Sequence, residues 1–564
     1  MHVTIAKDNY RNLTAAEIEQ LERQGNYAED WSTVRVAEPF RAASVRNSTF
    51  EGHVALGANV TIRDVRLLSD YTLGANVTLF NIGEMTGGGT PKPLEVMNEN
   101  GGRAILPFAG MTIGDAYMWA RYRGRKAFMQ KLEDFTSHLA PFTTHRSHVG
   151  DCCTIKNTTC IRNVNILSCE EDPTVVDSCI TLIDGVVGYG CTVEHGVIAE
   201  RFLLGEHVHL EFGLRLNDTV VGDNSTLARC EVGNSIIFPA HEQHHNNSFL
   251  IAGLIMGQSN IAAGGTIGSN HNSRTADNEI AAGRGFWPGL CCSFKHSSRF
   301  ASYCLLAKGD YPAELDITLP FALVNNNVSK DQLEVMPAYW WMYNMYAMDR
   351  NSKKFAKRDK RVVKAQHIEF DNLAPDTAEE MLHGMELLRK WMAAAKDGVV
   401  YAEGMEKSKR KTVVLKAAEG LKAYEDMLVY YAMKYLPQHI THHSSLNTKE
   451  WVNIGGQLVA KSDMEQLIAD VEKGALDSWE AIHGRFDALW EAYPAAREAH
   501  AYGVLCRLAG AEKLDDAQWQ RYQQRYAEIQ NYIEEQKVAS RHKDEVNPFR
   551  NMTYWDDDER QAVL

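Results

Sequence analysis

The chain has 564 residues, a formal net charge of −14, 45% hydrophobic residues and 23% charged residues. This composition excludes a mainly disordered chain, and the acidic balance argues against a dedicated nucleic-acid binder, which needs a basic surface. The length corresponds to about three to four ordinary domains or to one repetitive solenoid. No apolar run is long enough for a membrane span, and the polar N-terminus does not read as a secretory signal. We therefore expect a cytoplasmic protein with no membrane partner.

Residues 1–40 are predicted to cap one end of a solenoid, with a short helix near residues 14–24. In residues 41–330 an aliphatic residue recurs at intervals of six. The clearest copies are LGANVTI at 56–62, LGANVTL at 73–79, VGDCCTI at 149–155, VGYGCTV at 187–193, LGEHVHL at 204–210 and VGDNSTL at 221–227. A period of six fits neither an α-helix nor a simple strand, but it is typical of a parallel β-helix with three short faces per coil. Gly and Asn would occupy its corners, where a positive φ costs little.

Two further segments depart from this repeat. Residues 83–145 are predicted to be an insertion between coils, with an amphipathic helix at 113–139 and either a functional or a packing role. Residues 335–564 lose the repeat and read as an all-α domain. Its aromatic run at 339–346 is expected to dock the helices onto the β-helix. The basic run at 353–361 is expected to be a solvated helix face, with the phosphates of coenzyme A as the alternative partner.

The densest polar cluster is His241-Glu242-Gln243-His244-His245-Asn246-Asn247. Imidazoles next to a carboxylate suit proton transfer, and Glu242 could hold the tautomer of a basic histidine. A metal site and a solvated or subunit-interface loop are the alternatives. The cluster lacks the helical HExxH context of a zinc site, so no metal ligand is assigned. We expect His241, Glu242, His244 and His245 to contain the catalytic groups, and Asn246 to bind substrate.

A second polar cluster occupies residues 257–274. Its segment Asn260-Ile261-Ala262-Ala263-Gly264 resembles the N-I-x-A-G coil of the acetyltransferase domain of the bifunctional bacterial enzyme that acetylates and uridylylates glucosamine 1-phosphate. Many coils of such a fold would produce a similar sequence, which is the alternative interpretation. Asn270 falls near that family's corner asparagine, whereas His271 and Asn272 replace its Tyr-Asp.

The same resemblance places the family's catalytic histidine near His244, His245 and Asn246, without fixing which residue is the base. Asn260, Asn270, His271, Asn272 and Arg274 are then expected to bind substrate, with Arg274 as a planar clamp for an anionic group.

The combination of interrupted coils, the HEQHHNNSF loop, GSNHNSR and a long helical tail is similar to an uncharacterised family of large bacterial hexapeptide-repeat proteins. That resemblance covers nearly the whole chain. It implies a left-handed parallel β-helix, a homotrimer about the solenoid axis and sites in the clefts between subunits.

The leading functional hypothesis is a sugar- or sugar-phosphate-directed enzyme, namely an acyl-CoA-dependent transferase with a histidine general base. Its cofactor would be acetyl-CoA or another acyl-CoA, and its partner a small carbohydrate derivative. One alternative is a non-catalytic binding or scaffold protein. The other is a metal-dependent isomerase or hydratase, because the gamma-type carbonic anhydrases use interfacial histidines on this fold. Its candidate ligands are His195, His207, His241, His244 and His245.

Overall fold

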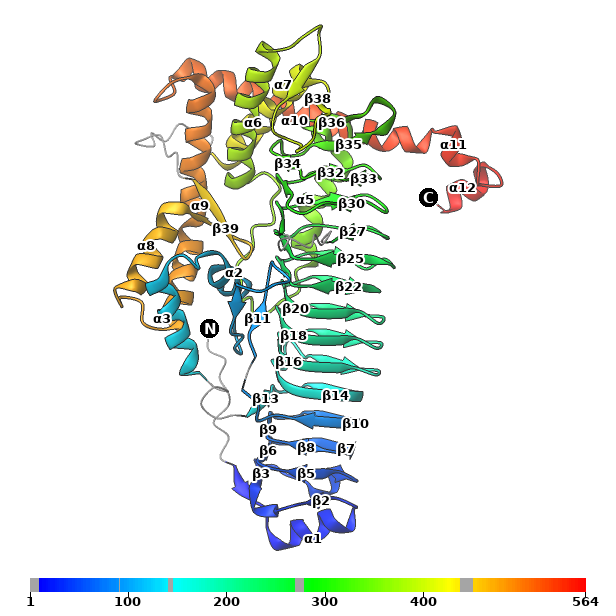
Figure 1. Cartoon of the computed structure of the whole chain (residues 1–564), viewed down its shortest axis with the longest axis vertical. Helices are drawn as coiled ribbons and strands as arrows, with labels where there is room; N and C mark the ends of the chain where they lie inside the picture. Colours follow the sequence, from blue (N-terminus) through cyan, green and yellow to red (C-terminus); the bar gives the residue numbers. More distant parts are fainter. Residues whose placement is uncertain (1–9, 91, 140–145, 269–277, 437–449, 564) are drawn as a thin grey trace.

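A computed structural model describes residues 10–90, 92–139, 146–268, 278–436 and 450–563. It shows a long β-solenoid with helices at its C-terminal end and along one side (Figure 1). Helix α1 (Ala15–Arg23) covers the N-terminal end, next to a short antiparallel pair of β1 (Arg11–Asn12) with β3 (Val34–Val36). Parallel pairing begins with β2 (Tyr27–Ala28), so the coils start within the segment that the sequence assigns to the cap.

The coils before the insertion contain β4 (Val45–Arg46), β5 (Thr49–Glu51), β6 (Val54–Leu56), β7 (Thr61–Val65), β8 (Leu68–Ser69), β9 (Tyr71–Leu73) and β10 (Thr78–Thr86). The middle coils contain β13 (Ser147–Val149), β14 (Thr154–Ile166), β15 (Val175–Asp177), β16 (Thr181–Val187), β17 (Thr192–Glu194), β18 (Ile198–Leu204), β19 (His209–Glu211), β20 (Arg215–Val221) and β21 (Thr226–Ala228).

The later coils contain β22 (Cys230–Gly233), β23 (Ile236–Ile237), β24 (Glu242–Gln243), β25 (Ser248–Ile251), β26 (Gly253–Ile255), β27 (Thr266–Ile267) and β28 (Ile280–Ala282). The last ones are formed by β29 (Trp287–Pro288), β30 (Ser293–Phe294), β31 (Arg299–Phe300), β32 (Leu305–Leu306), β33 (Asp310–Tyr311), β34 (Asp316–Ile317) and β35 (Leu323–Asn327). Strand β36 (Gln332–Met336) then turns back antiparallel to β35 and ends the solenoid.

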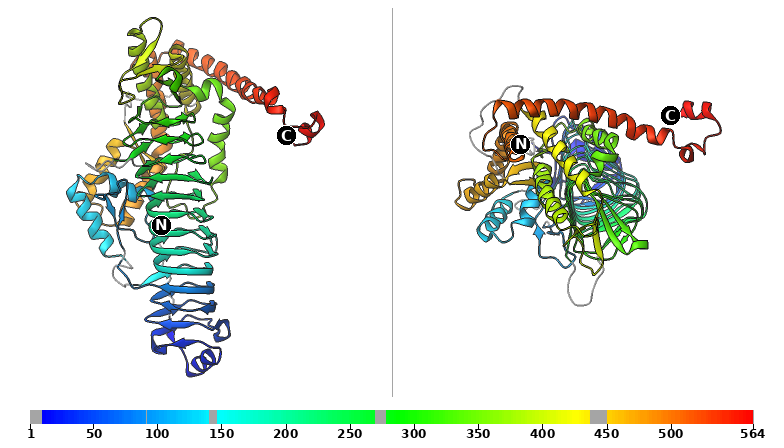
Figure 2. Two further views of the ribbon diagram at one scale, coloured as in Figure 1. Left: turned by 45° about the vertical axis from the view of Figure 1, so that its right-hand side comes forward. Right: turned by 90° about the horizontal axis from the view of Figure 1, so that it is seen from above.

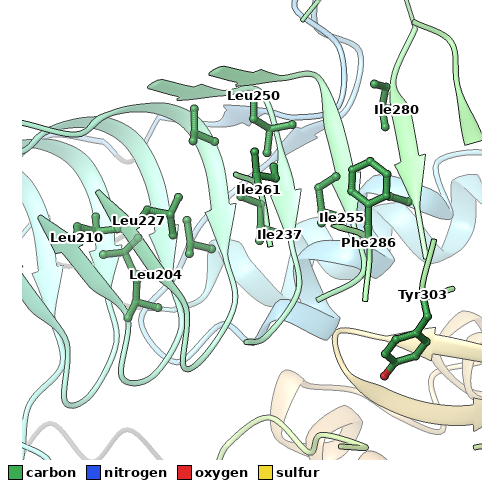
Figure 3. Packing of buried hydrophobic residues seen from close by; sticks show 14 of the residues in the cluster. Leu204, Leu210, Leu227, Ile237, Leu250, Ile255, Ile261, Ile280, Phe286 and Tyr303 are labelled. Carbon is green, nitrogen blue, oxygen red and sulfur yellow. The ribbon is translucent and has the colours of Figure 1, made fainter. Parts of the chain in front are cut away.

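A coil of the regular part takes 17 residues, because Leu182 pairs with Ala199 and Ala199 with Leu216. The inward side chains Val187, Val193, Ala199 and Leu204 are thus spaced by six, six and five residues, and all are buried. The shortened interval explains the shifts of frame in the sequence repeat. Inward residues of successive coils stack into one continuous core, part of which Figure 3 shows.

Glycine at the start of each repeat unit is required by close packing between coils. A Cβ on Gly205 would lie 2.0 Å from Oδ1 of Asp223, and a Cβ on Gly74 would lie 2.2 Å from Oδ1 of Asp151. Those carboxylates accept hydrogen bonds from backbone N–H groups of the preceding coil, at Glu206 and Ala75. The Val-Gly-Asp sequences therefore mark carboxylates that tie one coil to the next.

The insertion leaves the solenoid between β10 and β13. It contains the hairpin of β11 (Leu94–Glu95) with β12 (Ala104–Ile105), and two helices where the sequence predicts one, α2 (Ile113–Arg121) and α3 (Lys126–Ser137). Its core packs on outward-facing solenoid residues and on helices from the end of the chain. These outward residues, one per coil, are Val186, Leu203, Val220, Ile236 and Leu254.

The C-terminal region is mainly helical: α4 (Tyr339–Tyr343), α5 (Met345–Arg358), α6 (Pro375–Ala393), α7 (Ala417–Tyr435), α8 (Lys461–Glu472), α9 (Trp479–Ala509), α10 (Asp516–Glu545), α11 (Pro548–Asn551) and α12 (Asp557–Val563). It also holds two antiparallel pairs, β37 (Val400–Ala402) with β38 (Lys411–Val414), and β39 (Trp451–Ile454) with β40 (Gln457–Ala460). Helices α8 and α9 lie beside α3 of the insertion (Figure 1), whereas α10 carries α11 and α12 out past the body (Figure 2). Within the described ranges no helix has both the length and the apolar character needed to cross a bilayer.

Candidate functional site

The histidine-rich loop is divided between the inside and the outside of the solenoid. Side chains alternate along β24, so Gln243 takes an inward position beside Leu227 and Glu242 faces outward. His241 is fully buried, with Nδ1 2.8 Å from Oγ of Ser259 and Nε2 3.1 Å from Oε1 of Gln243. Burial lowers the pKa of His241 to about 4 and so disfavours its charged form.

The outward part of this loop meets helix α5. Nδ1 of His244 lies 3.1 Å from Oε2 of Glu242, and the His244 and His245 rings are 4.5 Å apart. Nη1 of Arg358 donates to Oε1 of Glu242 at 2.9 Å, and Nζ of Lys354 lies 3.9 Å from the same oxygen. The basic run and the histidine loop, separated by more than 100 residues in sequence, therefore share one surface.

The described part of the second polar cluster begins next to the histidine-rich loop. Asn260 lies beside Glu242 on the next coil, and Asn246 is exposed at the corner that precedes β25. Residues Asn270, His271, Asn272 and Arg274 lie outside the described residues. The segment that contains them follows β27, which pairs with β25.

Two of the histidines considered as metal ligands, His195 and His207, are also separated. His195 stacks on Phe212 at one corner, with ring centroids 4.9 Å apart, whereas Nε2 of His207 lies 2.8 Å from Oδ1 of Asp172 at another. His209 lies on strand β19 between these corners. Among the described residues, no three His, Cys, Asp or Glu side chains are placed to hold a metal ion together.

A pocket with a volume of about 250 Å³ lies where four segments of the chain meet. The solenoid supplies one wall, residues 110–112 of the insertion a second, residues 363–367 a third, and α9 a fourth. The lining side chains that carry polar groups include Thr112, Tyr189, Glu206, Asp223, Lys364, Gln366, His367, His483 and Asp487. A concave site of this kind, with converging polar groups, is where small ligands usually bind.

The third wall belongs to residues 359–369, which we call the strap and which link α5 to α6. Its backbone donates to solenoid carboxylates: the N–H groups of Val362 and Val363 to Oδ2 of Asp172 at 2.7 and 3.2 Å, and that of Ala365 to Oε1 of Glu206 at 3.0 Å. Gln366 joins the strap to the insertion by accepting from the backbone N–H of Gly114 at 2.8 Å.

Arg361 of the strap is buried in a carboxylate cluster. Its guanidinium donates to Oδ2 of Asp223 and, through Nε, to Oδ1 of Asp359 at 2.8 Å. Its Nη1 lies 3.7 Å from Oε2 of Glu206. Burial and the neighbouring Asp223 carboxylate raise the pKa of Glu206 to about 7. One guanidinium thus faces three carboxylates, of which Glu206 can carry a proton near neutral pH.

Helix α9 brings two histidine–carboxylate pairs to the pocket. Nε2 of His483 lies 2.8 Å from Oδ2 of Asp115, and Nε2 of His367 lies 2.7 Å from Oδ1 of Asp487. Burial disfavours the charge on His483, but the Asp115 carboxylate outweighs this effect, and the pKa of His483 is raised. A histidine held in this way can exchange a proton with a bound ligand.

Sequence reasoning did not find this pocket, although two signals for it exist. Glu206 and Asp223 occupy the position after the repeat glycine, where the N-terminal copies of the repeat have Ala58 and Ala75. In addition, doubled aliphatic residues such as Leu203-Leu204 indicate a solenoid face that is covered from outside, since only one of the two can point inward. The sequence around Arg361 gives no sign that this basic residue is buried.

The chain belongs to the family described as a domain of unknown function, DUF4954, whose model matches residues 10–67, 59–166 and 143–392. These ranges include the solenoid, the insertion and the strap. The chain is also similar to a protein of Treponema pallidum (strain Nichols) that is named "Uncharacterized protein". The two are 40% identical over 653 residues, which cover 98% of this chain and 90% of that protein. The family model thus covers three of the four walls of the pocket, and the similarity to the Treponema pallidum protein covers nearly the whole chain.

Proposed function

We propose that this protein is an enzyme that acts on a small carbohydrate, bound in the pocket between the solenoid and the helical region. The observation that carries the proposal is the His483–Asp115 pair in the wall of the pocket. With Nε2–H donating to the carboxylate, Nδ1 becomes the basic nitrogen, and His483 acts as the general base toward a substrate hydroxyl or amine.

The charges of the pocket favour an acceptor without a phosphate group. Three acidic residues, Glu206, Asp223 and Asp487, line the pocket. Lys364 is the lining residue that carries a permanent positive charge near neutral pH. Carboxylates accept hydrogen bonds from sugar hydroxyls, whereas they repel a phosphate. The proposal therefore keeps the sugar of the sequence-based hypothesis and sets aside the sugar phosphate at this site.

Binding of neutral monosaccharides, measured by titration calorimetry, tests this proposal. We expect at least one of them to bind the wild-type protein, and His483→Ala to weaken that binding by about tenfold, as expected for loss of one hydrogen bond to a polar ligand. His383→Ala is the matched control, because His383 lies exposed on α6. No binding by any sugar, or equal affinity in His483→Ala, contradicts the proposal.

A second candidate, acyl-CoA-dependent transfer at the histidine loop, is supported by the contact between that loop and α5. His244 would be the base held by Glu242, and Lys354 and Arg358 would attract the phosphates of an acyl-CoA. We expect acetyl-CoA to bind, and Lys354→Ala with Arg358→Ala to abolish the binding. Lys353→Ala on the same helix is the control, because Lys353 pairs with Asp349 instead. Acetyl-CoA binding that survives the double change contradicts this candidate.

The left-handed, hexapeptide-type solenoid and the homotrimer belong to the same proposal. An exposed ladder of His195, Phe212 and Arg229, with Arg229 4.2 Å from the Phe212 ring centroid, supports contacts between subunits along one solenoid corner. Native mass spectrometry tests the assembly, and a monomer at micromolar concentration contradicts it.

A further inference from the structure

Taken together, the elements that form the pocket bring more carboxylates than Lys and Arg side chains around it. The solenoid supplies Glu206 and Asp223, with Asp172 behind them paired to His207. The strap supplies Asp359, Arg361, Lys364 and His367; α9 supplies His483 and Asp487; and the insertion supplies Asp115 behind His483. A ligand that brings a positive charge is therefore favoured over a neutral or an anionic one of the same shape.

Within this set, Glu206 has an atom whose hydrogen-bonding capacity is not used. Its residue is 5% exposed, and Oε1 accepts from the N–H of Ala365. Oε2 is buried and has no hydrogen-bond partner among the described residues. The closest cationic atom is Nη1 of Arg361 at 3.7 Å, beyond hydrogen-bond distance, and that nitrogen already donates to Asp223 and to the carbonyl of Gln366. A buried acceptor of this kind is expected to have a partner, and a ligand can provide one.

The chemistry of the site limits what that partner can be. A phosphate or carboxylate would add negative charge beside Glu206 and Asp223. A metal ion would need several ligands in one place, and the described residues do not form such a set. An ammonium group is small, carries one positive charge and presents N–H donors in three directions.

We propose that the pocket binds a carbohydrate bearing a primary amino group, with the ammonium form paired to Oε2 of Glu206. This inference rests on the proposed function and narrows it to amino sugars. The raised pKa of Glu206 agrees with it: the carboxyl is readily protonated in the empty pocket and is held ionised when the ammonium binds.

Matched pairs of sugars test the inference. Titration calorimetry at pH 7 compares D-glucosamine with D-glucose, D-galactosamine with D-galactose, and D-mannosamine with D-mannose. For at least one pair we expect the amino sugar to bind about tenfold more tightly than its partner. We expect Glu206→Gln to remove this preference, while the partner sugar, which has a hydroxyl in place of the amino group, keeps its affinity. Glu200→Gln is the control, because Glu200 lies on β18, the strand that precedes Glu206, and is half-exposed and outside the pocket.

The outcomes separate this inference from the function on which it rests. Binding of sugars with equal affinity for the two members of every pair overturns the inference and leaves the carbohydrate function standing. A preference that persists in Glu206→Gln also overturns it. If none of the six sugars binds, the proposed function and this inference both fail. Circular dichroism spectra of the two variants, matched to wild type, confirm that the comparison is made on folded protein.

Discussion

Individual solenoid carboxylates, such as Asp172 and Glu206, hold the strap by hydrogen bonds. Of these two, Glu206 is the one whose pKa the fold raises. Its folded-state pKa of about 7 lies above the ordinary value of a glutamate, because burial and Asp223 oppose its charge. A carboxyl with a raised pKa stabilises the fold below its unfolded pKa, and this stabilisation is lost as the pH rises through the folded value. Glu380, buried beside Asp376, also has its pKa raised to about 7 and acts in the same direction.

We therefore expect the contributions of Glu206 and Glu380 to the free energy of unfolding to decrease between pH 5 and pH 8, whereas buried His241, with its lowered pKa, contributes in the opposite direction. Glu206→Gln mimics the protonated carboxyl, and it should reduce this decrease and stabilise the protein at pH 8 by about 1–3 kcal/mol. Urea denaturation at both pH values measures the effect. The variant Glu200→Gln should follow the wild-type curve. A Glu206→Gln variant whose free energy of unfolding changes between pH 5 and pH 8 in the same way as that of the wild type contradicts this account of Glu206.

At the level of elements, a row of outward aliphatic residues holds the insertion and α9 against the solenoid. Leu203 belongs to the same buried cluster as Trp119 of α2 and Trp479 of α9. The Nε1–H of Trp479 donates to Oγ1 of Thr136 on α3 at 3.0 Å. The pocket walls thus depend on one apolar interface that joins three distant parts of the sequence.

Leu203→Ala tests this dependence. It removes a fully buried side chain from the interface and should lower the free energy of unfolding by about 2–4 kcal/mol, as other buried Leu→Ala changes do. Hydrogen exchange should rise in α2 and α3 before it rises in the inward core of the solenoid. Ile198→Ala on the same strand is the control, since Ile198 is 38% exposed and should cost much less. Equal effects of the two changes would refute the role of the row.

For the whole molecule, the solenoid could be predicted from the sequence because its signal is local: each inward residue recurs five or six positions further on. The histidine cluster gives a weaker signal, because Gln243 occupies an inward position where other coils have an aliphatic residue. The repeat is therefore not recognisable there, and the sequence does not show that His241 is buried. The pocket could not be found in this way, since Arg361 meets Asp223 from 138 residues away and neither residue type implies the contact.

The C-terminal arm, residues 547–564, should contribute little to the stability of this assembly. In the described part of the arm, Asn551 and Arg560 bond back to the carbonyl of Glu545, and Phe549 and Trp555 are 80% and 91% exposed. The N-terminal part of α10 instead buries apolar side chains against the body, namely Trp519, Tyr522, Ile529 and Ile533. Ending the chain after Val546 should therefore leave Tm within about 1 °C of wild type in scanning calorimetry.

Ending the chain after Gly510 is the matched comparison, because it removes α10 together with the arm. The buried faces of α5 and α7 would lose the partner that covers them, and exposing that apolar surface should lower Tm by many degrees. The two truncations differ by a single helix, so their difference reports the packing of α10. A large fall in Tm after removal of residues 547–564 alone would contradict this prediction and would show that the arm packs on folded structure.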